Sequence, residues 1–172
     1  INHYFFRDEK YYRETKIPRK PVSKGAEVKA LCDGDTGIML RLDIMEGQAR
    51  QAQKAYADFG EGTACVLRLT TKYKGSGRTV VADSAFSSVK TLIKLESLHG
   101  LNFIGIVKTA TREYPMKSLK QWFTMQPKAR DERGNWKVWE SETEKGTRMY
   151  ALCWADKKAK CLISNRGTTL DD

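Results

Sequence analysis

The sequence predicts an α/β protein in which a mixed β-sheet is flanked by helices. Between residues 26 and 110, strand-like and helix-like patterns follow one another in the order β-β-(α)-β-α-β. Residues 111–172 carry further alternating runs, which predict an added small antiparallel β unit. The 172 residues, 40% of them hydrophobic and 30% charged, suit one globular domain with its own core.

An arm and a hairpin are expected first. Residues 1–25 are polar, aromatic and basic, and Pro18 and Pro21 favour extended backbone, which predicts an extended basic N-terminal arm. The segment AEVKALC then alternates, so we expect a half-buried strand that ends in the turn sequence DGDTG. A second strand, IMLRLDIMEG, follows at once and predicts an antiparallel hairpin with Asp33 at the end of its first strand. The side of the first strand expected to face the core carries Ala26, Val28, Ala30 and Cys32.

The middle of the chain predicts alternating helices and strands. Residues 48–59 could form a helix or a loop excursion, whereas TACVLRLTTKYKGSG has helical spacing and is expected to close at Gly75. RTVVADS predicts a strand that ends in Asp83, FSSVKTLIKLESLHG a helix stopped by Gly100, and LNFIGIVKTA a buried strand. In the last third, MKSLKQWFTMQ predicts a short amphipathic segment, WKVWESE a strand, and MYALCWADKKAKCLISN a hairpin.

Charge and cysteine usage narrow the classes of function. The chain has 31 Lys and Arg against 21 Asp and Glu, and a formal charge of +10 favours a polyanion such as nucleic acid; a solvated basic surface without a ligand remains the alternative. No apolar run approaches the length of a membrane span and the start lacks a signal peptide, so we expect an intracellular protein. His3 and His99 lie far apart, and the cysteines show no C-x-x-C spacing, which argues against zinc or disulfides and predicts reduced, buried thiols. The four cysteines are Cys32, Cys65, Cys153 and Cys161.

Two acids follow predicted buried strands and are the strongest candidates for chemistry. If the strand before Asp33 lies parallel and adjacent to the strand before Asp83, both carboxylates project from the same edge of the sheet. Like charges that close favour a shared divalent cation, and oxygen ligands suit Mg²⁺. The competing interpretation is structural, because Asp is also a common turn and helix-capping residue.

Other acids fit a site less well. Asp33, Asp35 and Gly37 imitate the start of a calcium loop, but Ile38 and Ile44 stand where that loop requires Gly and Glu, so the EF-hand interpretation is rejected. Asp43 inside the second strand and Asp156 in a hairpin turn are interpreted as structural or solvated residues.

Five segments in order and spacing resemble the catalytic domain of piggyBac transposases: IPRKPVSKG, ALCDGDTGIML, GRTVVADSAFSSV, FIGIVKT and YALCWADKKAKCLISN. In that family a strand ends in a catalytic Asp before a T-G or T-K turn, and a later D-N-x-F-T-S-like segment carries the second Asp. Asp33 and Asp83 occupy those positions, Phe86 and Ser88 match the second motif, and Ser84 and Ser87 replace the frequent Asn and Thr.

The resemblance implies an RNase H-like core over residues 26–110 and a DDE/DDD-type transposase that cuts and joins double-stranded DNA at transposon ends and target sites. Asp33 and Asp83 would be catalytic and metal-binding residues for Mg²⁺, with Mn²⁺ as a substitute, in two-metal chemistry. A homodimer of the full-length protein and a nuclear location are expected with it. In the family, the third Asp follows the last β hairpin and a further loop, near a Gly-rich motif, and ISNRGTTLDD stops before it. Asp171 and Asp172 are poor substitutes, so the segment is expected to be inactive alone.

Basic and aromatic residues complete the expected site. Phosphate contacts are expected from two groups, Arg13, Lys16, Arg19, Lys20 and Lys24 in the arm, and Lys108, Arg112, Lys117 and Lys120 after the last core strand. The four tryptophans could stack on bases, but packing in the core and between strands is favoured. A domesticated, catalytically inactive DNA- or protein-binding module is the alternative function, and an RNase H-type nuclease or a Holliday-junction resolvase ranks below it.

Overall fold

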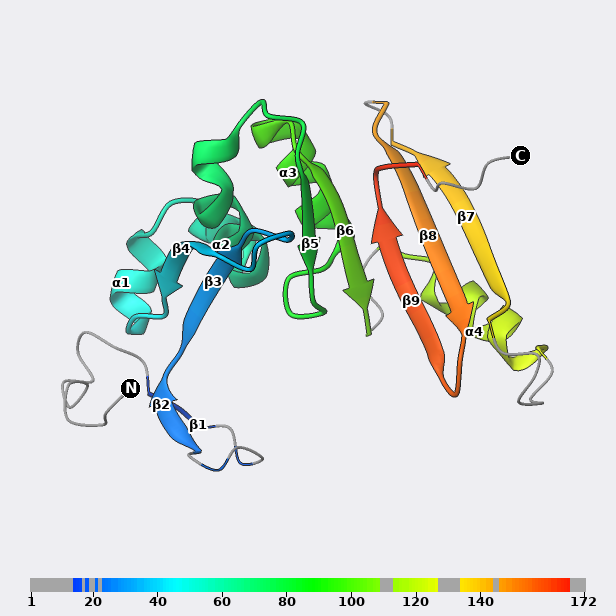
Figure 1. Cartoon of the computed structure of the whole chain (residues 1–172), viewed down its shortest axis with the longest axis horizontal. Coiled ribbons are helices and arrows are strands. Elements are labelled where there is room, and N and C mark those ends of the chain that lie inside the picture. Colours follow the sequence, from blue (N-terminus) through cyan, green and yellow to red (C-terminus); the bar gives the residue numbers. More distant parts are fainter. Residues whose placement is uncertain are drawn as a thin grey trace. The chain divides into compact units, whose positions relative to one another are not determined.

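The computed structural model describes residues 14–16, 18, 21, 23–108, 113–126, 134–143 and 146–167 (Figure 1). The chain forms two compact units, Ile1–Lys72 and Tyr73–Asp172, and each is described by itself. Within the described residues, no helix combines the length and the apolar character needed to cross a membrane. The predicted division at residues 25/26 and 110/111 stays a prediction.

The first unit contains two short antiparallel sheets. Strand β1 (Glu14–Lys16) pairs with β2 (Lys24–Ala26), so the described part of the predicted arm forms a ladder in which Lys16 lies opposite Lys24. Strand β3 (Val28–Cys32) pairs with β4 (Met39–Ile44), and the DGDTG turn connects them. The predicted hairpin with Asp33 at the end of its first strand is therefore confirmed.

The buried side of β3 is the opposite of the predicted one. Val28, Ala30 and Cys32 are exposed, whereas Lys29 and Leu31 are half-buried. Lys29 lies opposite Asp43 in the ladder, and the Asp43 carboxylate forms an ion pair with Arg68 of the helix at residues 61–70. Because the side facing that helix is polar, the apolar side of the hairpin faces away from it.

Helices complete the first unit. The segment with two open interpretations forms a short helix α1 (Gln48–Gln53) and a 3₁₀ turn η2 (Ala57–Phe59). The predicted next helix is α2 (Glu61–Thr70); it ends before the expected stop at Gly75 and is followed by the 3₁₀ turn η3 (Thr71–Tyr73). Helix α2 packs against β3 and β4. Ala64 and Leu67 on α2 are completely buried, so this helix supplies the apolar centre of the unit.

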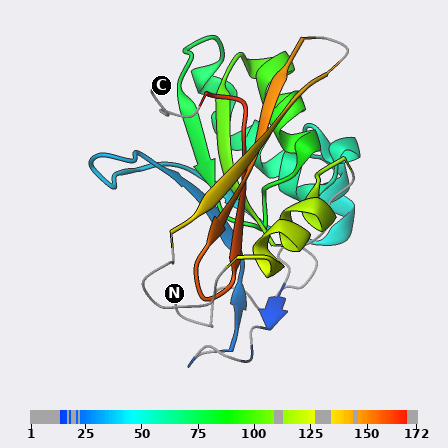
Figure 2. The ribbon, with the colours of Figure 1, turned by 90° about the vertical axis from the view of Figure 1, so that its right-hand side faces the viewer.

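A five-stranded mixed sheet forms the second unit, in the order β5-β6-β9-β8-β7 (Figures 1 and 2). Only β5 and β6 run parallel, and the other neighbours are antiparallel. The predicted antiparallel β unit of the last third is the β7-β8-β9 part, and β9 joins it to the core strand β6. The strands are β5 (Thr79–Ala82), β6 (Asn102–Val107), β7 (Trp136–Glu142), β8 (Arg148–Ala155) and β9 (Ala159–Ser164).

Two helices cover one side of this sheet. Helix α3 (Val89–His99) packs against β6, and α4 (Met116–Thr124) packs against β8 and β9, beside which Figure 2 shows it. Helix α3 ends at Gly100, which adopts a left-handed conformation with φ of 60°, as the stop signal in the sequence predicts. The resulting core contains the completely buried side chains of Leu92, Leu95, Phe103 and Leu119.

The sequence analysis placed Asp33 and Asp83 at one edge of a sheet on the condition that β3 pairs with β5. This pair is not among the ladders of the described strands. Strand β3 pairs with β4 alone, and β5 pairs with β6. The short DGDTG connection fixes the partner of β3 locally, whereas a ladder with β5 would need a crossover past α1, η2 and α2. Asp33 and Asp83 consequently end strands of two different sheets.

Candidate metal-binding acids and their turns

Asp33 closes the turn between β3 and β4. Its Oδ2 accepts hydrogen bonds from the Thr36 amide at 3.0 Å and from the Thr36 hydroxyl at 2.7 Å. Its amide donates to the Ile38 carbonyl at 2.8 Å, and its carbonyl accepts from the Gly37 amide at 3.0 Å. These bonds fix both the backbone and the carboxylate of Asp33 at the carboxyl end of β3.

Asp83 holds the turn between β5 and α3. Its side chain is exposed, and its Oδ1 accepts from the Ala85 amide at 2.8 Å. Its carbonyl accepts from the Ser87 hydroxyl at 2.7 Å and from the Phe86 amide at 3.2 Å. The carboxylate therefore projects from the carboxyl end of a strand that runs parallel to its neighbour, which is where ligands bind in α/β sheets.

Both acids thus do what the structural interpretation of the sequence expected of them, because each carboxylate accepts hydrogen bonds inside its own turn. Their carboxylate oxygens are also of the chemical kind that hard divalent cations prefer. Asp33 belongs to the first unit and Asp83 to the second.

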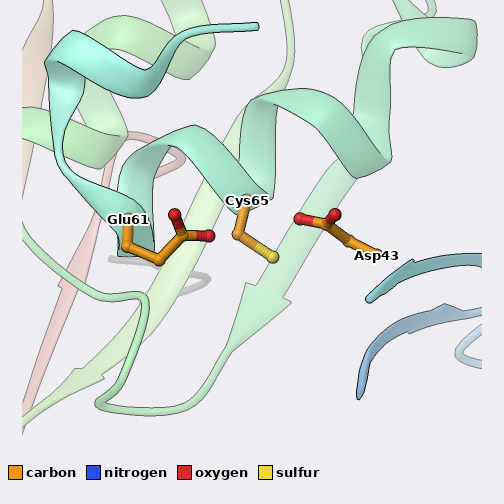
Figure 3. A group of neighbouring side chains, drawn as sticks. All are labelled: Asp43, Glu61 and Cys65. Atoms are coloured by element: carbon orange, nitrogen blue, oxygen red, sulfur yellow. The ribbon is translucent and has the colours of Figure 1, made fainter. Parts of the chain in front are cut away.

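A second group of possible metal ligands lies in the first unit. One ligand atom each of Asp43, Glu61 and Cys65 lie within 4.8 Å of one another. Asp43 comes from β4, and Glu61 and Cys65 lie one turn apart on α2 and point toward it (Figure 3). The sequence analysis missed Glu61 and Cys65; their i, i+4 spacing on one helix face was the signal that could have found them.

The acids of this group already form ion pairs with side chains of the protein. Arg68 donates from Nε and Nη2 to Oδ2 of Asp43 at 2.9 and 2.6 Å, and also binds Glu61. Lys54 binds Oδ1 of Asp43 at 2.9 Å and Oε2 of Glu46 at 3.3 Å. Two cations therefore already balance the acids around Asp43.

The electrostatics favour a structural role for the same group. Burial alone raises the pKa of Asp43, but the hydrogen bonds and charges of Lys54 and Arg68 outweigh it and hold the pKa below its usual value. Burial and the neighbouring Asp43 charge raise the pKa of the Cys65 thiol to about 12. A metal ligand must be deprotonated, so Cys65 is a poor one. The expectation that Asp43 is structural is confirmed by its ion pairs.

The cysteines are free, but one of them is placed differently from the prediction. Cys65, Cys153 and Cys161 are buried as expected, whereas Cys32 is exposed because β3 turns its apolar side outward. Cys153 and Cys161 lie opposite each other on β8 and β9 with their sulfur atoms 4.0 Å apart. Burial raises the pKa of Cys153 to about 12 and also raises that of Cys161.

Described residues among the predicted phosphate contacts lie at the surface. Lys16 and Lys24 face each other across β1 and β2, and Lys117 and Lys120 share the exposed face of α4. Lys108 is exposed directly after β6. Arg13, Arg19, Lys20 and Arg112 lie outside the described residues, as do the tail acids Asp171 and Asp172.

The tryptophans divide into two pairs. Trp122 and Trp139 are half-buried, whereas Trp136 and Trp154 lie opposite each other on β7 and β8 and are 48% and 52% exposed. The expected contact between strands is present, but the expected burial of Trp136 and Trp154 is wrong. Their side of the sheet is opposite to the one that buries Cys153 and Ala155, because successive side chains on β8 alternate between its faces.

Comparison with solved structures identifies the fold. The chain is similar to the piggyBac transposase in a cryo-electron microscopy structure of its synaptic complex with hairpin DNA, with a TM-score of 0.70 and 21% sequence identity. The match covers 92% of this chain and 30% of that transposase, so the chain spans less than a third of its length. No curated protein matches the sequence.

The strand-acid-turn-helix arrangement and the similarity in fold define the class, a catalytic-domain segment of a DDE-type transposase. The family model described as transposase IS4 matches residues 7–171, and the chain belongs to this family. The resemblance to piggyBac transposases found in the sequence is thereby confirmed. Enzymes of this class use divalent metal ions bound by acidic residues.

Proposed function

We propose that the chain supplies two of the metal-binding acids of a piggyBac-like cut-and-paste transposase, which cleaves DNA strands and transfers them to a target. The observation that carries the proposal is the placement of Asp33 and Asp83. Each stands at the carboxyl end of a strand in a turn that fixes its backbone, in a chain matched by a transposase family model over residues 7–171. Both acids also match the catalytic positions of the piggyBac motifs.

The donor set fits Mg²⁺, with Mn²⁺ as a substitute, because both proposed ligands are carboxylates, and hard divalent cations prefer carboxylate oxygens. When bound, two such ions activate a water or a 3′-hydroxyl and stabilise the leaving oxygen of the phosphate. The chain's own contribution is to orient the two carboxylates. The Thr36 hydrogen bonds do so for Asp33 and the Ala85 amide does so for Asp83.

Double-stranded DNA, as transposon ends and as target, is the proposed partner. The solved relative is described as a synaptic complex with hairpin DNA, and the chain carries a formal charge of +10. Lys16, Lys24, Lys108, Lys117 and Lys120 are proposed to contact phosphates; all five are exposed. Dimerisation of the full-length protein and action in the nucleus form part of the same proposal.

The test is metal-dependent nicking and strand transfer on DNA that bears the element's ends, in a transposase that contains this segment and all three acids. We expect Asp33→Asn and Asp83→Asn each to abolish both reactions in Mg²⁺ and in Mn²⁺, while DNA binding remains. Asp35→Asn, in the same turn as Asp33, and Asp156→Asn, in the β8–β9 turn, are the matched controls and are expected to keep activity. Activity retained by Asp33→Asn or Asp83→Asn contradicts the proposal. An inactive wild type that binds DNA favours a binding module instead.

A further inference from the structure

We infer that Ser87 is a positioning residue for Asp83 and that residue 105 must be glycine to leave room for it. The inference rests on the proposed function, in which Asp83 binds the metal. It concerns one contact in the second unit, between Ser87 in the turn after β5 and Gly105 on the neighbouring strand β6.

The Ser87 hydroxyl binds the backbone of Asp83 directly. Ser87 Oγ donates to the Asp83 carbonyl at 2.7 Å and lies 3.4 Å from the Ala82 carbonyl. Ser87 is only 6% exposed, so water cannot easily replace this bond. The hydroxyl thus links the buried side of the turn to the residue whose carboxylate projects outward.

Gly105 provides the space that Ser87 occupies. Gly105 lies on β6 directly beside Ala82 of β5. A Cβ atom at residue 105 would lie 2.1 Å from Ser87 Oγ and 2.8 Å from Ser87 Cβ. It would also lie 2.8 Å from Cε1 of Phe103, which is completely buried. Any side chain at 105 must therefore displace Ser87, because the packed core offers no other space.

Helix capping does not account for Ser87. The N-cap of α3 is Ser88, whose Oγ accepts from the Thr91 amide at 3.0 Å. The two adjacent serines thus have different roles: Ser88 begins the helix, and Ser87 binds the turn to the end of β5, where Gly105 of β6 leaves room for it. Because the Asp83 carboxylate is held by the Ala85 amide of the same turn, a shift of the turn moves the carboxylate as well.

The experiment follows this chain by NMR with two readouts. Amide hydrogen exchange at Ala85 and Phe86 reports the turn, and paramagnetic broadening around Asp83 on titration with Mn²⁺ reports metal affinity. We expect Ser87→Ala and Gly105→Ala to speed exchange at both amides and to weaken Mn²⁺ binding about tenfold, as for residues that orient a metal ligand. Ser87→Thr restores the hydroxyl and is expected to stay close to wild type.

Ser88→Ala is the matched control. It removes the cap of α3, so it is expected to speed exchange at Thr91 and lower stability while leaving Mn²⁺ affinity unchanged. If Ser87→Ala and Gly105→Ala bind Mn²⁺ as tightly as wild type, the positioning role is overturned, whatever their exchange rates. If Asp83→Asn still shows the wild-type broadening, or wild type shows none there, the metal assignment itself fails, and exchange at Ala85 still decides whether Ser87 and Gly105 hold the turn.

Discussion

Arg68 joins two carboxylates from different elements, Asp43 on β4 and Glu61 at the start of α2. The side chains of Arg68 and Asp43 are only 11% and 9% exposed, so removal of the guanidinium leaves a buried charge short of a partner. We predict that Arg68→Met lowers the free energy of unfolding by about 3 kcal/mol. Urea unfolding of both proteins measures this difference in the free energy of unfolding. Arg50→Met is the control: its pair with Glu46 has a 51% exposed arginine and is expected to contribute less than about 1 kcal/mol. Equal losses would contradict the anchoring role.

The buried imidazole of His99 makes stability depend on pH. Burial first, and the charge of Lys74 second, lower the pKa of His99 below 6.5, so the folded protein favours the neutral ring. The unfolded chain binds the proton more readily, and stability therefore falls as the pH drops below about 6.5 toward the lowered folded pKa. Above that pH the contribution is complete. Asp43, whose pKa is also lowered, weakens the fold only below about pH 4.

Unfolding free energies between about pH 5 and pH 8 test this prediction. We expect His99→Gln to flatten the profile in that window and to leave the loss at lower pH, which belongs to carboxylates such as Asp43. A wild-type profile that stays level from pH 8 to pH 5 would contradict the assignment to His99.

Single residues were predictable where chemistry and local pattern coincide. Asp33 and Asp83 were found because each ends a strand-like run before turn residues, and both occupy such ends. Arg68 and the Ser87–Gly105 contact were not found. Both depend on residues far away in the sequence. A glycine in a strand or an arginine in a helix does not by itself predict which side chain it contacts.

At the scale of elements, hydrophobic spacing predicted the helices better than the faces of strands. Helices α2, α3 and α4 lie where helical spacing and the Gly100 stop indicated them. The alternation of VKALC, by contrast, divides the side chains of β3 between two faces of the hairpin. We expected the apolar face to be buried. The ion pairs of Asp43 explain why the other face is buried, because a buried charge needs partners, and these are Lys54, directly after α1, and Arg68 on α2.

The end of α3 allows a direct test of backbone strain. Gly100 has a φ of 60°, and its amide donates to the Glu96 carbonyl at 2.8 Å. A Cβ here would lie 3.6 Å from the Gly75 Cα, which is an ordinary contact, so the cost of Gly100→Ala is conformational. We predict a loss of about 1 kcal/mol, or roughly 2–4 °C in melting temperature.

Calorimetry of Gly100→Ala and of Gly34→Ala separates this strain from a general effect of replacing glycine. Gly34 has no neighbour within 4 Å of an added Cβ and no left-handed φ, so its substitution is expected to change stability little. Equal melting shifts for the two variants would show that the left-handed cap does not determine the cost at residue 100.

For the whole molecule, local patterns predicted strands β3 to β9 but not all of their partners. The β8–β9 hairpin was predictable because a polar turn of a few residues connects two alternating runs. Its attachment to the core through β6 and β9 was not, since pairs such as Val107 with Cys161 join segments that are distant in sequence. The same limitation applies to β3 and β5, which both precede candidate acids but belong to different sheets.

With a net charge of +10, the protein could bind DNA through its overall charge or through particular lysines, and a salt titration distinguishes the two. Each phosphate contact adds about 0.9 to the slope of log K against log salt concentration for duplex DNA. If Lys117 and Lys120 on α4 contact phosphates, Lys117→Gln/Lys120→Gln is expected to reduce the slope by about 1.8.

The double variant Lys157→Gln/Lys158→Gln carries the same charge change in the exposed β8–β9 turn, outside the proposed contacts. It is expected to reduce the slope much less, as measured by fluorescence anisotropy on one duplex over a range of salt concentrations. Equal reductions would mean that the protein binds DNA through its overall charge, and α4 would lose its place in the interface. A larger reduction for the α4 variant would locate the phosphate backbone along the exposed face of that helix, because counterions are released only where lysines contact phosphates.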